Sequence, residues 1–158
     1  RRARGFDMKV RYYNRSRLPV DQEQACGAEY VDRETLLKES DHIILVMPYT
    51  PENHHLFGEK ELALMKPTAT LVNIARGGIV DELALAKALE QGKIFSAGLD
   101  VFEGEPSVRP ELLAQKNIVL APHVGSATEK TRRAMIELAI KNCMAGLQGQ
   151  TPPNLLSS

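Results

Sequence analysis

Short apolar runs alternate with amphipathic segments along most of the chain. Aliphatic and aromatic runs that stop at turn-forming residues predict strands. The predicted strands cover residues 8–14, 28–31, 42–47, 69–74, 94–101 and 117–121. Apolar positions at helical spacing predict helices over residues 32–40, 58–65 and 81–92, and a longer helix from residue 126 to about Leu147.

The predicted helices carry residues that favour helix ends. Asp32 and Asp81 stand at N-cap positions, and Gly92 stands at the C′ position of the third helix. In "SATE", Ser126 and Glu129 have the spacing of a capping box, so we expect Ser126 to cap the last helix. Strands and helices in alternation indicate right-handed βαβ units. The expected fold class is therefore α/β, with a parallel sheet covered on both faces.

The composition is that of an ordinary globular chain. At 158 residues, 43% hydrophobic and 25% charged, the chain is long enough for one domain. No apolar run approaches the ~20 residues of a membrane helix, and no signal-peptide pattern opens the sequence, so we expect no membrane partner. Cys26 and Cys143 lack a paired spacing. This predicts neither a disulfide framework nor a zinc site, and it favours a reducing, cytoplasmic location.

The net charge of zero is unevenly distributed. Residues 1–17 hold six arginines and one lysine against one aspartate, a net +6, so the remainder sums to −6. A basic arm is one mark of nucleic-acid binding, but no aromatic or repetitive pattern accompanies this one. We therefore expect no nucleic-acid partner and interpret the charge as a local anion site.

Polar residues with complementary chemistry follow three consecutive predicted strands. Arg76 follows residues 69–74, Asp100 ends residues 94–101 with Glu105 just beyond, and His123 follows residues 117–121. Ligands of open α/β sheets bind at the carboxyl ends of the strands. An arginine can grip a carboxylate, a histidine can transfer a proton, and an acid can orient the histidine. These are the requirements for reducing a 2-keto acid with a nicotinamide cofactor.

Each of these residues also has a plain structural interpretation. Arg76 and Glu103 are also consistent with solvated charges, His123 with a loop histidine, and Asp100 with the cap of a turn. The adjacent His54 and His55 raise the question of a metal ion. Because neighbouring side chains are expected to diverge and no carboxylate cluster follows them, the sequence predicts no metal site.

Three segments occur in order at suitable intervals: "NIARGGIVDELALAKALEQGKI", "AGLDVFEGEP" and "APHVGSAT". They resemble the signatures of the D-2-hydroxyacid dehydrogenases, and the resemblance extends over essentially the whole chain. The chain is most similar to the glyoxylate/hydroxypyruvate reductases and the 2-ketogluconate reductases of that family. The resemblance implies an oxidoreductase that reduces a small 2-keto acid and that forms a homodimer when intact.

The resemblance also implies roles for individual residues. Arg76 would bind the substrate carboxylate, His123 would be the acid/base, and Glu105 would be the carboxylate partner of His123. The cofactor-binding residues that it implies, besides Arg76 and His123, are Asp100 at the nicotinamide carboxamide, Ala75 and Gly125 in the nicotinamide pocket, and Met47, Pro48 and Thr50 on the adenosine side. Asn53 departs from the family, which usually has threonine there.

The choice of dinucleotide follows from the four residues Asn14, Arg15, Ser16 and Arg17. NAD-binding folds place an acid at this strand end to bind the ribose 2′-hydroxyl, whereas NADP-binding folds place arginine nearby. No acid is present here. The sequence therefore predicts NADP(H) as the preferred cofactor, with NAD(H) as a possible one.

The resemblance implies a Rossmann-type doubly wound sheet that is incomplete. The glycine-rich G-x-G-x-x-G turn and the strand before it are absent from the sequence, and "RRARGFD" resembles the last turn of the following helix, ended by Gly5. Residues 1–148 are predicted to be a partial nucleotide-binding domain, and residues 149–158 a tail that leads toward a missing substrate domain. We expect this fragment alone to be inactive. A dinucleotide-sensing co-repressor on the same fold is the alternative to an enzyme.

Overall fold

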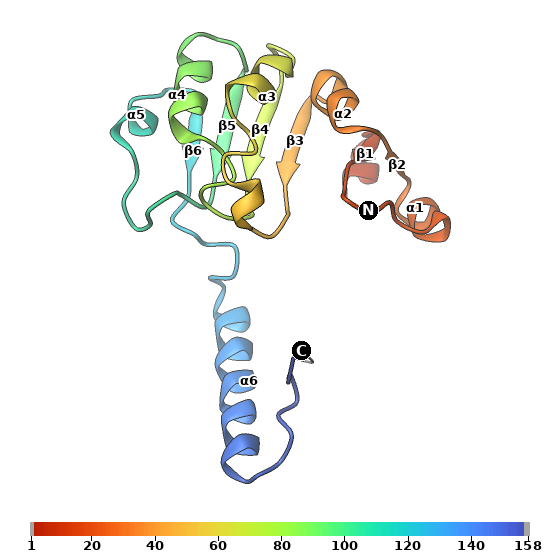
Figure 1. The fold of residues 1–158 in the computed structure, drawn as a ribbon, viewed down its shortest axis with the longest axis vertical. Helices are drawn as coiled ribbons and strands as arrows, with labels where there is room; N and C mark the ends of the chain where they lie inside the picture. The colour runs from red at the N-terminus through yellow and green to blue at the C-terminus, as the bar shows by residue number, and fades with distance from the viewer. Residues whose placement is uncertain (1, 157–158) are drawn as a thin grey trace. The chain divides into compact units, whose positions relative to one another are not determined.

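A computed structural model describes residues 2–156 of the 158-residue chain. The chain divides into two units, Arg1–Ala121 and Pro122–Ser158. Figure 1 labels the elements in chain order. Unit 1 contains η1 Ala3–Phe6, β1 Val10–Tyr12, α1 Val20–Cys26, β2 Ala28–Tyr30, α2 Arg33–Glu39, β3 His42–Leu45, η2 Pro51–Asn53, α3 Glu59–Leu64, β4 Thr70–Asn73, α4 Glu82–Glu90, β5 Ser96–Leu99, α5 Pro110–Leu113 and β6 Ile118–Leu120; unit 2 contains α6 Glu129–Leu147. Every predicted strand is present, and each is shorter than predicted.

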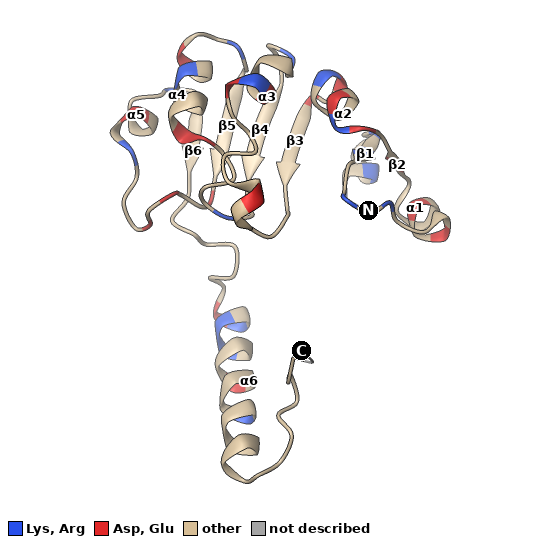
Figure 2. Ribbon diagram, viewed as in Figure 1, with Lys and Arg blue, Asp and Glu red and all other residues tan. Residues whose placement is uncertain are grey.

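The larger sheet has the order β3-β4-β5-β6, and all its strands are parallel. None of these four strands carries Lys, Arg, Asp or Glu (Figure 2). One face packs against the helices: Leu71, Leu85 and Leu89 are buried in the same core. The other face is more open, since Ile44 is 57% and Val119 is 72% exposed. Burial of a leucine side chain contributes about 1.5–3 kcal/mol, so the helix-facing side of the sheet supplies most of the stability of this layer.

The smaller sheet consists of β1 and β2 alone, which are also parallel. Its strands bring Tyr12 and Tyr30 edge to face, with ring centroids 5.4 Å apart. Arg11 of β1 pairs with Glu29 of β2 and with Glu39 at the end of α2. Parallel strands and intervening helices confirm the α/β class. The division of the strands into two sheets was not predicted.

Most of the expected helix ends are confirmed. Asp32 accepts a hydrogen bond from the Thr35 amide, and Asp81 accepts from the amides of Leu83 and Ala84. Gly92 follows α4 with a φ of +63°, in the left-handed region that favours glycine.

Two of the expected helix ends are wrong. The N-cap of α6 is Thr128 and not Ser126, because the Thr128 hydroxyl accepts the Thr131 amide at the first turn. The first turn of the chain ends at Asp7, whose φ is +55°, and not at Gly5, which lies inside η1. Both errors shift an end by two residues.

Helices α1 and α5 were not predicted. The α1 segment, "VDQEQAC", has few apolar residues to mark a helical face, and it is closed by Gly27 with a φ of +61°. The α5 segment has only four residues and begins with Pro110 at N1, where the missing amide hydrogen is tolerated. Segments this short give no periodic signal.

Unit 2 contains α6 and the chain that follows it. The apolar side chains Met135, Leu138 and Leu147 of this helix are exposed. Among the described residues, no helix is both long enough and apolar enough to cross a membrane.

The turn after β4 generates a prediction about stability. A Cβ atom at Gly77 would lie 1.9 Å from the carbonyl oxygen of Phe102, and backbone cannot move aside as a side chain can. We expect Gly77→Ala to lower the free energy of unfolding by about 1–3 kcal/mol or more, measured by urea denaturation. Gly98→Ala is the matched control, because its Cβ would meet only Val72 methyl groups at 3.8 Å. Equal effects of the two substitutions would contradict this account of the turn.

Candidate active site

The carboxyl ends of β3, β4 and β5 lie at one edge of the larger sheet (Figure 1). The loops that leave this edge contain most of the predicted site residues of unit 1. Met47, Pro48 and Thr50 follow β3, Ala75 and Arg76 follow β4, and Asp100 follows β5. The parallel register therefore gathers, within one unit, side chains that are distant in sequence.

The turn that carries Arg76 is held by the side chain of Asn73, the last residue of β4, which is only 2% exposed. The Asn73 side chain accepts a hydrogen bond from the Ala75 amide and donates one to the Arg76 carbonyl, both at 3.0 Å. Arg76 itself is exposed, and its Nη1 donates to the Ala75 carbonyl at 2.7 Å. The buried amide fixes the backbone, so the guanidinium is presented from a rigid base.

Glu105 lies in the loop between β5 and α5. One oxygen of its carboxylate accepts a hydrogen bond from the Phe102 amide at 3.0 Å. This bond folds the side chain back over its own loop, six residues beyond the end of β5. Asp100, at the strand end, is half-buried, and its amide donates to the Asn73 carbonyl.

His123 and Gly125 belong to unit 2, whereas Arg76 and Glu105 belong to unit 1. His123 has a φ of +52°, an uncommon conformation for a non-glycine residue and one that often marks a functional turn. The predicted pairing of His123 with Glu105 stays a prediction.

The loop after β3 is organised by Asn53, the residue that departs from the family pattern. Its side-chain oxygen accepts the Thr50 amide at 2.8 Å, and its nitrogen donates to the Pro48 carbonyl at 2.7 Å. Asn53 thus closes a reciprocal cap on η2. Asn53, although it differs from the usual threonine, therefore stabilises the loop that is predicted to face adenosine.

The predicted anion site at residues 14–17 contains a network that sequence reasoning missed. Glu23 of α1 is 7% exposed, and its two oxygens accept from Nε and Nη2 of Arg17, both at 2.8 Å. The Tyr12 hydroxyl donates to the same carboxylate at 2.5 Å and accepts the Leu18 amide. Arg17 also lies 5.6 Å from the centre of the Tyr30 ring. The pattern "RxxxxxE" has no familiar meaning in sequence, so only the fold reveals this contact.

Arg15 differs from Arg17 in its surroundings. Its amide bonds to the Asn14 side chain, while its own side chain is exposed and makes no hydrogen bond or ion pair with the part of the chain that the structure describes. The two arginines are therefore not equivalent. Arg17 is held in a bidentate pair, and Arg15 extends toward solvent.

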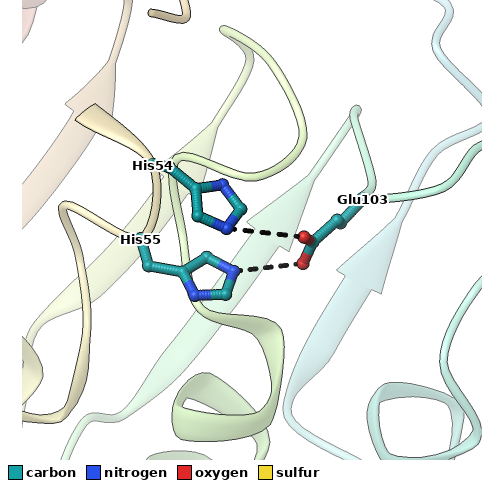
Figure 3. Close-up of side chains that lie close together, drawn as sticks. All are labelled: His54, His55 and Glu103. Carbon is teal, nitrogen blue, oxygen red and sulfur yellow. Dashed lines mark hydrogen bonds and ion pairs between the residues drawn. The ribbon is translucent and has the colours of Figure 1, made fainter. Parts of the chain in front are cut away.

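A third cluster joins His54, His55 and Glu103, as Figure 3 shows. The two imidazole rings are stacked, with centroids 3.8 Å apart and planes 22° apart. Nε2 of His55 lies 3.1 Å from one Glu103 oxygen, and Nε2 of His54 lies 3.8 Å from the other. The expectation that these two histidines diverge is wrong, because the φ of +52° at His55 turns its ring beside that of His54.

The donor set of this cluster, two imidazoles and one carboxylate, is of a kind that binds zinc. A zinc ion would have to lie in the plane of each ring, and planes that are stacked and nearly parallel have no common point close to both nitrogens. Arg109 Nη2 also lies 3.6 Å from the same carboxylate. The arrangement fits a fork of hydrogen bonds to Glu103, and the His55 hydrogen bond lowers the pKa of the Glu103 carboxyl.

The chain was compared with known families, sequences and structures. Residues 1–125 match the model of the family described as D-isomer specific 2-hydroxyacid dehydrogenase, NAD binding domain. Glyoxylate reductase from Thermococcus litoralis is 57% identical over 157 residues, which cover 99% of this chain and 47% of that relative. Glyoxylate/hydroxypyruvate reductase B from Shigella boydii is 47% identical over 154 residues.

Solved structures agree with the sequence comparison. A glyoxylate reductase from Paecilomyes thermophila is 43% identical with a TM-score of 0.85, over 95% of this chain and 45% of that one. An NADPH-dependent glyoxylate/hydroxypyruvate reductase from Sinorhizobium meliloti, solved with NADP and malonate, is 35% identical with a TM-score of 0.84, over 91% of this chain and 44% of that one.

Parallel strands, strand-end loops and the matched model define a dinucleotide-binding domain of the Rossmann type. The chain belongs to the D-isomer specific 2-hydroxyacid dehydrogenases, as part of their NAD-binding domain. It spans about half the length of the curated relatives it matches.

The Glu23 network generates a prediction about pH. Hydrogen bonds from Arg17 and then Tyr12 lower the pKa of the Glu23 carboxyl to about 2 from an ordinary 4.5. A lowered folded-state pKa stabilises the fold above the unfolded value, and this contribution is lost as the pH falls from 4.5 toward 2. We expect Glu23→Gln to lower the Tm at pH 7 and the difference from wild type to shrink over that interval. Glu90→Gln, on the exposed side of α4, is the control; a Glu23→Gln difference independent of pH would contradict the assignment.

Proposed function

We propose that the protein containing this chain reduces a small 2-keto acid, glyoxylate or hydroxypyruvate, with NADPH. The observation that carries the proposal is the exposed Arg76 guanidinium on its fixed turn, at the sheet edge where this fold binds ligands. The relatives that are 47–57% identical, named as glyoxylate or glyoxylate/hydroxypyruvate reductases, support the same substrate class.

In this proposal Arg76 binds the substrate carboxylate through two parallel charge-assisted hydrogen bonds. His123 protonates the carbonyl oxygen as hydride arrives from the nicotinamide, and Glu105 orients the His123 ring and favours its protonated form. Ala75, Asp100 and Gly125 border the nicotinamide. The cofactor supplies the hydride, and the chain supplies charge, orientation and the proton.

Met47, Pro48 and Thr50 are assigned to the adenosine side of the cofactor. The loop that carries Pro48 and Thr50 is closed by the Asn53 side chain, which gives it one defined shape. Met47 packs against the core, so the base of this loop is anchored.

We assign NADP(H) as the preferred dinucleotide, with NAD(H) used less well. Asn14, Arg15, Ser16 and Arg17 offer no acid for a ribose 2′-hydroxyl and two arginines for a 2′-phosphate. Because Glu23 neutralises Arg17, the larger share of phosphate binding falls to Arg15. The NADP-bound relative from Sinorhizobium meliloti is consistent with this assignment.

Three further expectations concern the activity of this chain alone, and the assembly and location of the intact protein. Residues 1–158 span 47% of the length of the Thermococcus litoralis relative, so we propose that this chain alone has little or no reductase activity. A homodimeric intact protein and a cytoplasmic location stay predictions from the sequence. A 2-ketogluconate reductase and a dinucleotide-sensing co-repressor are outcomes that the assays below distinguish.

The cofactor assignment is tested by measuring kcat/KM for NADPH and NADH with the intact protein. We expect NADPH to be preferred, and Arg15→Ala to reduce that preference by about 10–150-fold, since a charged hydrogen bond contributes about 1.5–3 kcal/mol. Arg17→Ala should have a smaller effect on the NADPH/NADH ratio. An NADH preference in the wild-type protein would refute the cofactor assignment.

The substrate assignment is tested with glyoxylate, hydroxypyruvate and 2-ketogluconate, following NADPH absorbance. We expect Arg76→Ala chiefly to raise KM for the keto acid, with Arg76→Lys restoring charge but not the two-pronged grip. His123→Ala should lower kcat by roughly 10²-fold or more. Unchanged kcat/KM in Arg76→Ala would remove the proposed clamp, and no NADPH oxidation with any substrate would favour the co-repressor.

A further inference from the structure

Three loops of unit 1 lie together around Glu103: its side chain faces His54 and His55 (Figure 3), and the backbone at Phe102 and Glu103 lies against Gly77. They are the segment 48–58 after β3, the turn 75–81 after β4, and the segment 101–109 after β5. Arg76 lies in the second loop and Glu105 in the third. The contacts between these loops therefore decide where the two proposed active-site residues stand relative to each other.

The first two loops are joined by backbone hydrogen bonds. The His55 amide donates to the Gly78 carbonyl at 2.7 Å, and the Phe57 amide donates to the Ile79 carbonyl at 3.0 Å. The Asp81 amide completes this short ladder by donating to the Phe57 carbonyl at 3.0 Å. The ladder ties segment 48–58 to the turn that carries Arg76.

The third loop makes a different kind of contact. Its backbone at Phe102 lies against Gly77, and the Glu103 amide donates to Oε1 of Glu82 at 2.6 Å. Glu82 is only 3% exposed and lies at the first turn of α4, directly after the Arg76 turn. These contacts hold one point of the loop. Glu105 lies two residues further on, beyond Gly104, whose φ is +81°.

The Glu103 carboxylate supplies a further attachment, beside the Arg109 Nε that lies 3.4 Å from Oε2 of Glu82. It faces Nε2 of His55 at 3.1 Å and Nε2 of His54 at 3.8 Å, and Arg109 Nη2 lies 3.6 Å from it. The outer nitrogens of the rings are also engaged: the Tyr49 hydroxyl lies 3.2 Å from Nδ1 of His54, and Asp81 Oδ2 lies 3.9 Å from Nδ1 of His55. Glu103 lies two residues before Glu105. Its carboxylate thus links the Glu105 loop to segment 48–58, which is joined to the Arg76 turn.

We propose that Glu103 is a positioning residue, which through His54 and His55, and supported by Arg109 of its own loop, fixes the Glu105 loop against the Arg76 turn. This proposal rests on the proposed function, because it concerns the relative placement of two residues of that site. Charge-assisted hydrogen bonds are shorter and stronger than neutral ones, so an ionised Glu103 holds the loop more firmly than an amide would. Small displacements of active-site groups reduce rates steeply, by up to about 10²-fold for 1 Å.

The test uses Glu103→Gln, His55→Ala and the double variant of the intact protein, with Glu90→Gln as the control. Glu103→Gln keeps the size of the side chain and removes its charge. We expect it to lower kcat/KM for glyoxylate by about tenfold or more, while the Kd for NADPH stays within about twofold of wild type. If the variant had only lost stability, then well below its Tm its kcat/KM and its Kd for NADPH would either both change or both stay unchanged.

The double variant tests whether Glu103 and His55 act through their mutual contact or independently. If Glu103 acts through His55, the double variant should be no slower than the slower single variant, since residues in one network are not additive. Additive losses, or a Glu103→Gln variant within twofold of wild type in kcat/KM, would overturn the proposal.

Amide hydrogen exchange gives a readout that does not require turnover. We expect Glu103→Gln to speed exchange at the Glu103–Glu105 amides by about tenfold relative to Glu90→Gln, because the loop opens more often when its side-chain link is lost. Unchanged exchange would overturn the proposal. A wild-type protein without reductase activity would instead refute the proposed function, and the exchange measurement would still decide whether Glu103 holds the loop.

Discussion

The site of this protein depends on one close approach, the packing of the Gly77 backbone against the Phe102 carbonyl. A side chain at Gly77 would collide with that carbonyl, so only glycine lets the turn after β4 touch the loop after β5. Arg76 precedes this contact, and Glu105 follows it by three residues. The buried Asn73 side chain holds the turn through hydrogen bonds to the Ala75 amide and the Arg76 carbonyl.

Two carboxylates in unit 1 hold loops in place by pairing with a neighbouring arginine or histidine. Glu23 pairs with Arg17 and holds the segment that is proposed to recognise the dinucleotide phosphate. Glu103 faces His55 and holds the segment that carries Glu105. In each case the acid lies on a different element from its partner, so the pair restrains a loop from a second element. The loops of this domain are held both by such charged pairs and by buried apolar side chains, among them Phe57, Val80 and Phe102.

The comparisons show the family of this chain, and they also show that the chain covers only part of its relatives. The match over residues 1–125 assigns the chain to the D-isomer specific 2-hydroxyacid dehydrogenases. The chain nevertheless spans about half of each relative, and the strands of unit 1 form two sheets and not one.

The α/β class, the strands, and the caps at Asp32 and Asp81 are predictable from sequence alone, because they depend on local periodicity and on hydrogen bonds within a few residues. The candidate residues at the strand ends were also predictable, since parallel strands bring their carboxyl ends to one edge. The sequence missed α1 and α5, which are too short to show a period, and placed the cap of α6 two residues early. Only the tertiary structure brought Glu23 to Arg17 and Glu103 to His55. Glu23 and Arg17 are 6 residues apart, and Glu103 and His55 are 48 residues apart. The folded path of the chain, and not the spacing of these residues in the sequence, decides which charged groups meet.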